Sequence, residues 1–427
     1  MLYATTTAST GPETETQGPA GGSPPIDAEQ ILTALGTPAG RADPYPLYAA
    51  LRKLGDVVEL GPQVVLVVGY DNINAVLRDP GFLVSDEAAF DQGFPGWRDH
   101  PVFVQSVDWI LNINAPRHGR IRSLLAKTFT ARRVAGMRPA IEAMADELLD
   151  AIADHGADGS AVEFMQEFAY RLPVTVICEL IGIPESDRAG FRPLARDLTG
   201  IFELQDIAPL PRINAAAVEL HSYFTDLAAC RRSDPRDDLL SDLLAISDAA
   251  DGRLTDAALL HNMTLLLVAG FETTTNLLDN GLQIVLDRPE YVESVRVGSV
   301  PAAAFVEEVV RFDSPVQLTS RRCYDTTVGG VHVSGQTEAM LLLGAGNRDP
   351  RRFADAQSFD PSRHDGGPLS FGGGAHFCIG AALARLEGAV AFPRLFSRFP
   401  KIAPAGEPTR RDTLLLRGFD ALPVSVV

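Results

Sequence analysis

The chain has 427 residues, a formal net charge of −18 and a hydrophobic fraction of 46%, which together indicate a soluble globular protein with a sizeable core. Such an acidic surface repels nucleic acid and anionic lipid, so neither is expected as a partner. No apolar run approaches the ~20 residues of a membrane-spanning helix, and no basic N-terminal region precedes an apolar one. Four widely spaced cysteines indicate no disulfide framework, and we expect a cytoplasmic protein.

The sequence divides into a short tail and one large body. Residues 1–25 are rich in Thr, Gly, Pro and Ser and contain scarcely any large apolar side chain, a composition that predicts a disordered N-terminal tail. A length of this size favours two or three domains. Because no linker-like stretch interrupts residues 26–427, we expect a single domain there.

Helical periodicity dominates the body. In chain order, the patterns predict strands within Val57–Val68, helices at Arg138–His155, Asp256–Leu286 and Pro301–Phe312, and strands within Thr327–Val333. Between the first strands and the first helix, residues 82–109 carry Phe90, Phe94, Trp97 and Phe103 among Gly and Pro. This segment is expected to form a mobile aromatic lid for a large apolar or amphipathic ligand, although ordinary loop packing explains each aromatic residue equally well.

The middle of the longest predicted helix is interrupted by the sequence Ala269-Gly270-Phe271-Glu272-Thr273. Glycine in a helix costs roughly 1 kcal/mol relative to alanine, and threonine hydroxyls can bond back to the preceding turn and bend the helix. These residues predict a groove at the centre of a helix about 46 Å long. A solvated Glu and Thr on an exposed helix is the alternative, and the leucines on both sides argue against it.

Two further pairs have helical spacing. His118 and Arg122 are four residues apart, so they share a helical face and can reach the same carboxylate. Glu308 and Arg311 are three apart and can form an ion pair, which on its own is most simply a surface pair.

The segment Phe371–Gly380 presents Cys378 from a glycine-rich loop at the start of an Ala/Leu-rich helix. A helix N-terminus stabilises a thiolate, and Gly372, Gly374 and Gly380 let a flat group approach the backbone. A buried structural cysteine, a zinc site and a phosphate loop are the alternatives. Zinc would need further ligands beside His376, and no Gly-Lys-Ser/Thr sequence follows. The loop therefore predicts a seat for haem.

These motifs resemble those of the cytochrome P450 family, and the resemblance covers Asp27 to Val427. The loop matches Phe-Gly-x-Gly-x-His-x-Cys-x-Gly, the interrupted helix matches Ala/Gly-Gly-x-Asp/Glu-Thr, and Glu308 and Arg311 match Glu-x-x-Arg. The resemblance implies a mainly α fold with a small β region, in which haem b lies between the long central helix and the helix after the cysteine loop. Asn114-Ala115-Pro116 departs from the family's Asp-Pro-Pro, and Pro393 is expected to end or kink the last helix.

The resemblance also implies roles for individual residues. Cys378 is the expected iron ligand, Thr273 acts on bound O₂, and Glu272 relays protons to it. The other haem-binding residues implied are His118, Arg122, Arg321, His376, Phe371, Gly372, Gly380, Ala269 and Gly270. Arg322 is an alternative to Arg321, because the following segment is one residue shorter than usual. Glu308 and Arg311 are expected to be structural. Phe90, Val316, Leu318 and Phe419 are the residues expected to contact substrate.

The function implied is that of a monooxygenase that inserts one atom of O₂ into an organic molecule. A polyketide, macrolide, terpenoid or aromatic secondary metabolite is the expected substrate class. Electrons are expected from a ferredoxin and an NAD(P)H-dependent reductase, docked on a basic patch formed by Arg120, Arg132, Arg133, Arg351, Arg352 and Arg363. The alternatives are a haem-thiolate sensor or peroxide-rearranging enzyme that does not activate O₂, and a helical scaffold with an incidental cysteine.

Overall fold

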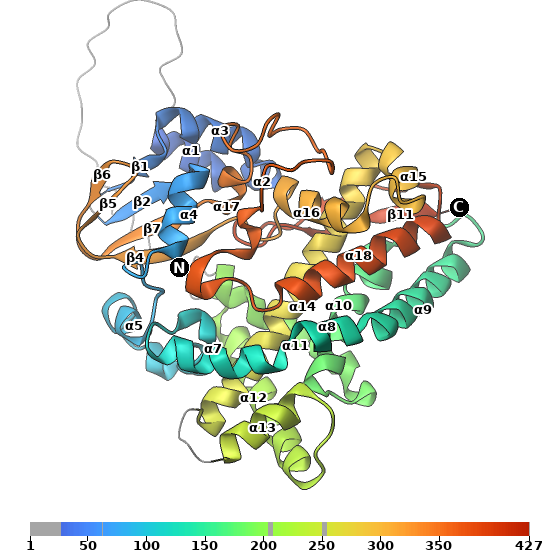
Figure 1. The fold of residues 1–427 in the computed structure, drawn as a ribbon, viewed down its shortest axis with the longest axis horizontal. Helices are drawn as coiled ribbons and strands as arrows, with labels where there is room; N and C mark the ends of the chain where they lie inside the picture. Colours follow the sequence, from blue (N-terminus) through green and yellow to red (C-terminus); the bar gives the residue numbers. More distant parts are fainter. Residues whose placement is uncertain (1–26, 62, 204–207, 250–253, 427) are drawn as a thin grey trace, which may run out of the picture.

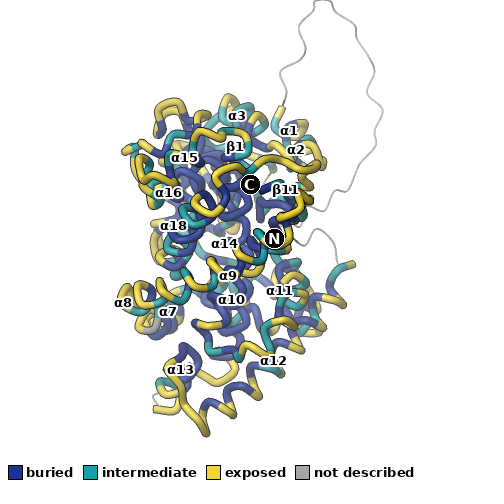
Figure 2. The backbone as a smooth tube through the Cα atoms, turned by 90° about the vertical axis from the view of Figure 1, so that its right-hand side faces the viewer, coloured by how far each residue is buried: buried dark blue, intermediate teal, exposed yellow. Residues whose placement is uncertain are grey.

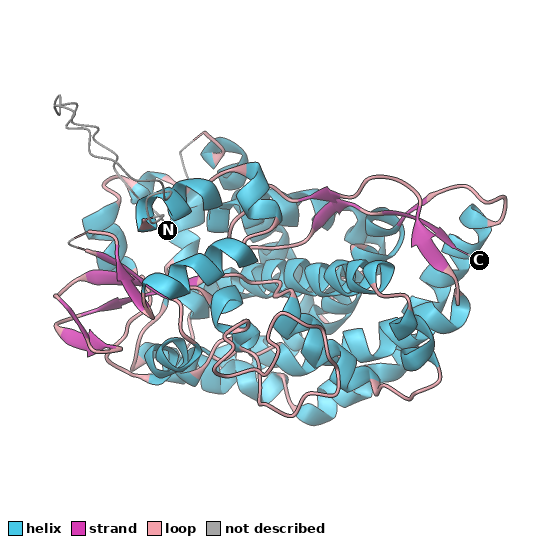
Figure 3. Cartoon of the chain, turned by 90° about the horizontal axis from the view of Figure 1, so that it is seen from above, coloured by secondary structure: helices cyan, strands magenta, loops and turns pink. Residues whose placement is uncertain are grey.

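A computed structural model describes residues 27–61, 63–203, 208–249 and 254–426, so the tail expected at residues 1–25 lies outside the described residues. Helices make up most of the molecule, and the strands gather in small sheets towards its edges (Figures 1 and 3). The expectation of a mainly α fold with a small β region is confirmed. Among the described residues, no helix is both long enough and apolar enough to cross a bilayer.

The elements follow in chain order. The helices are α1 Ala28–Leu35, α2 Pro38–Ala42, α3 Tyr45–Leu54, α4 Tyr70–Arg78, α5 Glu87–Gly93, α6 Pro101–Ser106, α7 Arg117–Thr128, α8 Ala131–Gly136, α9 Arg138–Gly156, α10 Arg171–Ile181, α11 Phe191–Thr199, α12 Leu210–Ser233, α13 Leu239–Asp248, α14 Asp256–Asp287, α15 Glu290–Arg296, α16 Ala302–Phe312, α17 Leu343–Gly346 and α18 Ala381–Arg398. The strands are β1 Val57–Glu59, β2 Val64–Val67, β3 Val162–Glu163, β4 Thr319–Cys323, β5 Thr326–Val328, β6 Val331–Val333, β7 Thr337–Leu341, β8 Ile402–Pro404, β9 Thr409–Arg410, β10 Phe419–Ala421 and β11 Pro423–Val426.

Helix α14 runs through the middle of the molecule and is buried along most of its length (Figures 1 and 2). It begins after Thr255, whose side chain accepts a hydrogen bond from the Ala258 N–H and caps the helix. It ends at Asp287, two residues before Pro289, which cannot continue a helix. The helix expected at Asp256–Leu286 is therefore confirmed.

The main sheet has four strands in the order β1-β2-β7-β4, with β2 and β7 parallel and the other pairs antiparallel. The strand region expected at Val57–Val68 is a hairpin of β1 and β2, and the region at Thr327–Val333 is a hairpin of β5 and β6. A three-stranded sheet, β3-β11-β8, joins the end of the chain to the body. The main sheet matters for function because β4 carries Arg321 into the central cavity.

The expected lid at residues 82–109 is mostly helical rather than a loop. It contains α5, a short 3₁₀ turn at Trp97–Asp99, and α6. Phe90, Trp97 and Phe103 are at most 5% exposed, and the Phe90 ring lies 5.7 Å from the Trp97 ring and 5.6 Å from the Phe103 ring between centroids. These aromatic residues belong to the main hydrophobic core, with Phe94 packed against it, so they anchor this segment to the body of the molecule.

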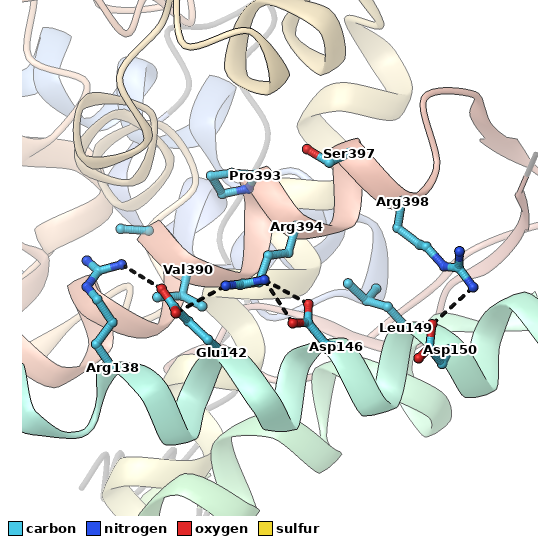
Figure 4. Close-up of a pocket in the computed structure, with 11 residues that line it drawn as sticks. Arg138, Glu142, Asp146, Leu149, Asp150, Val390, Pro393, Arg394, Ser397 and Arg398 are labelled. Carbon is cyan, nitrogen blue, oxygen red and sulfur yellow. Dashed lines mark hydrogen bonds and ion pairs between the residues drawn. The ribbon is translucent and has the colours of Figure 1, made fainter.

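Helix α18 continues through Pro393 to Arg398, so of the two expected effects of the proline, an end or a kink, the end does not occur. Proline in a helix interior costs about 3 kcal/mol. Buried Phe392 and Phe396 on either side pack into the core, and ion pairs tie the helix to α9. Figure 4 shows Arg394 between Glu142 and Asp146, and Arg398 beside Asp150. Packing on both faces therefore offsets the cost of the proline.

Candidate active site

A cavity of about 290 Å³ lies between α14, α7, β4 and the loop that precedes α18. Its lining is mainly apolar and includes Leu265, Leu266, Leu277, Val310 and Leu383, together with Cys378. A larger groove of about 710 Å³ lies on the surface between α9 and α18 (Figure 4), but its arginines and carboxylates pair with one another. The central cavity is therefore the candidate site, because the reactive residue Cys378 lines its open space.

The loop before α18 holds Cys378 at the cavity wall. Gly372 has φ of +70° and Gly374 has φ of +62°, a backbone region that favours glycine. The Cys378 N–H donates to the Phe371 carbonyl at 2.9 Å, which fixes the sulfur-bearing residue to the loop. Burial raises the pKa of the Cys378 thiol, while hydrogen bonds from the backbone N–H groups of Gly380 and Ala381 lower it. The helix N-terminus thus favours the thiolate against the effect of burial.

Four basic side chains surround the same cavity: His118, Arg122, Arg321 and His376. The rings of His118 and His376 are 4.1 Å apart between centroids. Burial, and then the neighbouring His118, Arg321 and Arg122, lower the pKa of His376 to about 3. Burial lowers the pKa of Arg321 to about 10. Two arginines and two imidazole rings at one cavity supply the charge and the hydrogen-bond donors that an anionic ligand requires.

The basic residues fit the carboxylates of haem. Arg321 is 7% exposed and forms no ion pair with an acid among the described residues, and His118 Nε2 is buried without a hydrogen-bond partner there. Arg322, the alternative, points elsewhere and donates from Nη2 to Gln92 Oε1 at 2.9 Å. Arg122 is held by a hydrogen bond from Nη2 to the Phe377 carbonyl at 2.6 Å. The donor set and the cysteine sulfur together suit a planar iron porphyrin with two carboxylates.

Helix α14 faces this cavity with Ala269, Gly270 and Thr273. The Thr273 hydroxyl donates to the Ala269 carbonyl at 2.9 Å, a bond to the preceding turn of the kind the sequence predicts. Glu272 behaves differently. It is 1% exposed, does not line the cavity and forms an ion pair with Arg411. The two residues expected to act together therefore lie on different sides of the helix.

The residues expected to contact substrate separate into three locations. Val316 lines the central cavity, whereas Phe90 and Leu318 line an adjoining compartment of about 180 Å³. The two spaces share Leu111, Thr319 and Arg321. Phe419 lines neither of them: it is 1% exposed, and the Arg410 guanidinium lies over its ring at 3.9 Å. The C-terminal segment turns this residue into the core, which corrects the expectation that it faces a ligand.

Sequence reasoning missed several residues at the site. Ile110 and Leu111 line the central cavity, and Trp109 lines the adjoining compartment. Asn262 of α14 holds this segment in place, because its Oδ1 accepts from the Ile110 N–H at 2.9 Å. Glu387 of α18 also lines the cavity, and burial raises its pKa well above the ordinary value. Its place in the second turn of α18, the helix that follows the Cys378 loop directly, was the signal that the sequence offered.

The chain is similar to proteins of one family. The family model for cytochrome P450 matches residues 302–418. The 6-deoxyerythronolide B hydroxylase of Saccharopolyspora erythraea is 37% identical over 396 residues, which is 90% of this chain and 96% of the relative. The cytochrome P450 monooxygenase PikC of Streptomyces venezuelae is 38% identical over 423 residues, which is 96% of each chain.

Solved structures agree with this similarity. The ligand-free structure of CYP164A2 from Mycobacterium smegmatis has a TM-score of 0.82 and 34% identity, covering 93% of this chain and all of the other. P450BioI, in complex with an acyl carrier protein ligated to hexadec-9Z-enoic acid, has a TM-score of 0.84 and 31% identity over 91% of this chain. The chain therefore belongs to the cytochrome P450 family.

Proposed function

We propose that this cytochrome P450 monooxygenase inserts one oxygen atom into a macrolide or polyketide secondary metabolite. The observation that carries the proposal is that the Cys378 sulfur and the Thr273 side chain of α14 line the same mainly apolar cavity. The adjoining compartment extends this space and adds polar groups such as Ser85 and Asn112. An elongated molecule with an apolar reacting part and an oxygen-bearing remainder suits both. The similarity to 6-deoxyerythronolide B hydroxylase and to the monooxygenase PikC supports the substrate class.

Haem b is the cofactor that these residues would hold. Cys378 would supply the thiolate ligand, and His118, Arg122, Arg321 and His376 would bind the two carboxylates. Bound there, the haem supplies the iron–thiolate chemistry that favours cleavage of the O–O bond. The protein contributes an apolar cavity that excludes bulk water and orients the substrate. It also contributes the Thr273 hydroxyl, which can donate to the Ala269 carbonyl or turn into the cavity to hold a proton there.

Replacing Thr273 by alanine should leave haem and substrate binding intact but lower the product formed per NADPH by about 10-fold, because a proton donor at the cavity is lost. The missing product should appear as hydrogen peroxide. Thr275→Val is the matched control, because Thr275 is fully buried and its hydroxyl donates within the helix, to the Phe271 carbonyl at 3.0 Å. Equal product per NADPH in wild type and Thr273→Ala would refute the role of Thr273.

A ferredoxin with an NAD(P)H-dependent reductase is the proposed electron source. The basic patch expected from the sequence contains fewer than six unpaired arginines, because acidic side chains neutralise the charges of several of them. Arg133 pairs with Asp237 and Asp242, Arg351 pairs with Asp56 and Asp349, and Arg363 pairs with Glu308 and Asp365. Arg120 and Arg132 are exposed and have no acidic partner among the described residues. Arg352 lies over the Tyr70 ring at 5.0 Å.

Arg132→Glu is therefore expected to slow electron transfer from an acidic ferredoxin by about 10-fold at low salt, with a smaller difference as salt rises. Stopped-flow measurement of haem reduction tests this. Lys401→Glu changes an exposed charge at the start of β8 and should leave the rate unchanged. Identical rates and salt dependence for Arg132→Glu and wild type would mean that the donor binds elsewhere.

Binding and turnover of a macrolactone panel test the function itself. The panel includes 6-deoxyerythronolide B, the compound in the name of one relative. We expect displacement of water from the iron, seen as a shift of the haem absorption band, followed by a hydroxylated product with ferredoxin, reductase, O₂ and NADPH. Haem reduction without product across the panel would favour a sensor, and product formed from a peroxide without O₂ would favour a rearranging enzyme.

A further inference from the structure

The segment that runs from α6 into α7 forms a wall of both spaces, but the core does not hold all of it. Ile110 and Leu111 line the central cavity, and Trp109 and Leu111 line the adjoining compartment. Trp109 and Ile110 are 1% and 8% exposed and belong to the core, whereas Leu111 is 41% exposed. Packing alone therefore does not fix Leu111, and its position depends on how the backbone before it is held.

Asn262 of α14 holds this backbone at two points. Its Oδ1 accepts from the Ile110 N–H at 2.9 Å, and its Nδ2 donates to the Asp108 carbonyl at 2.8 Å. The same Nδ2 donates to the Ala258 carbonyl at 2.7 Å, one turn earlier in the helix, which fixes the direction of the amide. Because Asn262 is 1% exposed, breaking these bonds would leave buried polar groups without partners.

The side chain of Asp108 adds a second attachment. Its Oδ2 lies 2.8 Å from His261 Nδ1 of α14, and its Oδ1 forms an ion pair with Arg117, the first residue of α7. Burial raises the pKa of Asp108, but hydrogen bonds from His261 and Arg117 outweigh this effect and hold the pKa below its ordinary value. Hydrogen bonds to an ionised carboxylate are the strong ones. One carboxylate thus joins the segment to the central helix and to the helix that carries His118.

These attachments lie behind the wall of the site. Asn262, His261 and Asp108 line neither of the two spaces, so they affect a bound molecule through the residues that they hold. Leu111 stands where the two spaces meet, since it lines both of them. A shift of Leu111 would therefore change the passage between the central cavity and the adjoining compartment.

We propose that Asn262 and Asp108 are positioning residues that keep Leu111 at this junction and so decide how an elongated substrate lies across the two spaces. The inference rests on the proposed function, because the orientation of a macrolactone decides which of its carbon atoms is oxidised. A displacement of about 1 Å is enough to alter the reaction of a bound molecule. Loosening either attachment should therefore change the ratio of oxidised products more than the total rate of oxidation.

Hydrogen exchange in the substrate-free holoprotein tests the attachment itself. Asn262→Leu leaves the Ile110 N–H without its acceptor, so exchange at this amide, followed by mass spectrometry, should become about 10-fold faster. Thr264→Val is the matched control, because it removes a buried hydroxyl of α14 that donates within the helix, to the Leu260 carbonyl. It should leave exchange at Ile110 unchanged. Equal exchange in Asn262→Leu and wild type would overturn the proposal.

Asp108→Asn is the second variant, and it replaces Asn262→Leu where the latter does not fold. It keeps the size of a side chain that is 20% exposed and removes the charge that binds His261 and Arg117. Exchange at Ile110 should become about 3-fold faster, a smaller effect because the Asn262 bonds remain. Unchanged exchange in a folded Asp108→Asn would remove Asp108 from the proposal.

Product analysis tests the effect on orientation. With 6-deoxyerythronolide B as substrate, the ratio of hydroxylated positions should change about 5-fold in Asn262→Leu, with total oxidation within about 2-fold of wild type. In a Leu111→Ala background, the same substitution should change the ratio less than about 2-fold, because the residue through which it acts is gone. A merely structural role would give equal effects in both backgrounds, or a lower rate with an unchanged ratio. Either result would overturn the proposal.

A binding measurement keeps this failure distinct from a failure of the proposed function. If wild type oxidises no macrolactone, the proposed function fails, and 4-phenylimidazole replaces the substrate as probe, because its nitrogen binds haem iron and its phenyl ring packs in an apolar cavity. Its affinity should weaken about 5-fold in Asn262→Leu through lost apolar contact, while that of imidazole, which lacks the phenyl ring, stays the same. Equal changes for the two compounds, or no change for either, would overturn the positioning role.

Discussion

Replacing Cys378 with histidine is expected to abolish the red-shifted Soret band of the reduced, CO-bound protein and to remove all monooxygenase activity. The band depends on a thiolate ligand, and among the four cysteines Cys378 alone lines the central cavity. Cys178 and Cys323 are at most 2% exposed and belong to the core. The measurement is a difference spectrum between the reduced protein with and without CO.

The control for this variant is Cys230→Ser, which changes an exposed cysteine on α12 and should leave the band in place. Haem content of each variant, measured after extraction, separates loss of the ligand from loss of the cofactor. A red-shifted band that persists in Cys378→His would show that another residue binds the iron, and the assignment of the cavity would be wrong.

Replacing Glu308 with glutamine should destabilise the protein by about 3–5 kcal/mol, the effect of leaving one partner of a buried ion pair without its counter-charge. Glu308 and Arg311 are 4% and 2% exposed and form two hydrogen bonds of 2.6 and 2.7 Å. The Arg311 guanidinium also donates to the carbonyls of Asn347, Ala356 and Ser358. The pair therefore anchors the segment that leads into the cysteine loop, and haem occupancy should fall as well.

Glu307→Gln is the matched control, because the adjacent residue forms an ion pair with Arg385 in which both side chains are over one-third exposed. Exposed pairs contribute about 0–1 kcal/mol, so this variant should unfold within 1 kcal/mol of wild type. Denaturant unfolding followed by circular dichroism measures both. Equal stability losses in the two variants would show that burial of the Glu308 pair has no special effect.

Local patterns predicted the parts of the site that depend on local geometry. The spacing of His118 and Arg122 is a property of one helix, and both side chains line one cavity. The glycines around Cys378 similarly fix a turn within a few residues. The bounds of α14 followed from its apolar periodicity, and the structure adds a local cap at its start and a proline just beyond its end. In each case the physical cause lies within one or two turns of the residue concerned.

Contacts between segments that lie far apart in the chain could not be predicted from the sequence. The ion pair of Glu272 with Arg411 and the burial of Phe419 both depend on how the C-terminal segment packs on α14. The acidic partners of Arg133, and Asp56, one of the two partners of Arg351, likewise come from distant parts of the chain, so the basic patch could not be counted correctly. The lid was expected to be a loop because its Gly and Pro residues suggested one, whereas its aromatic residues pack together and stabilise short helices.

Turnover under isotopically labelled O₂ tests the central claim most directly. Wild-type protein, reduced by ferredoxin and its reductase, should convert the macrolactone that binds most tightly into a product carrying one labelled oxygen atom, with the other atom recovered as water. Mass spectrometry of the product decides the result. A product that contains oxygen only from the solvent, or no oxidised product from any macrolactone that binds, would contradict a monooxygenase acting on this class of molecule.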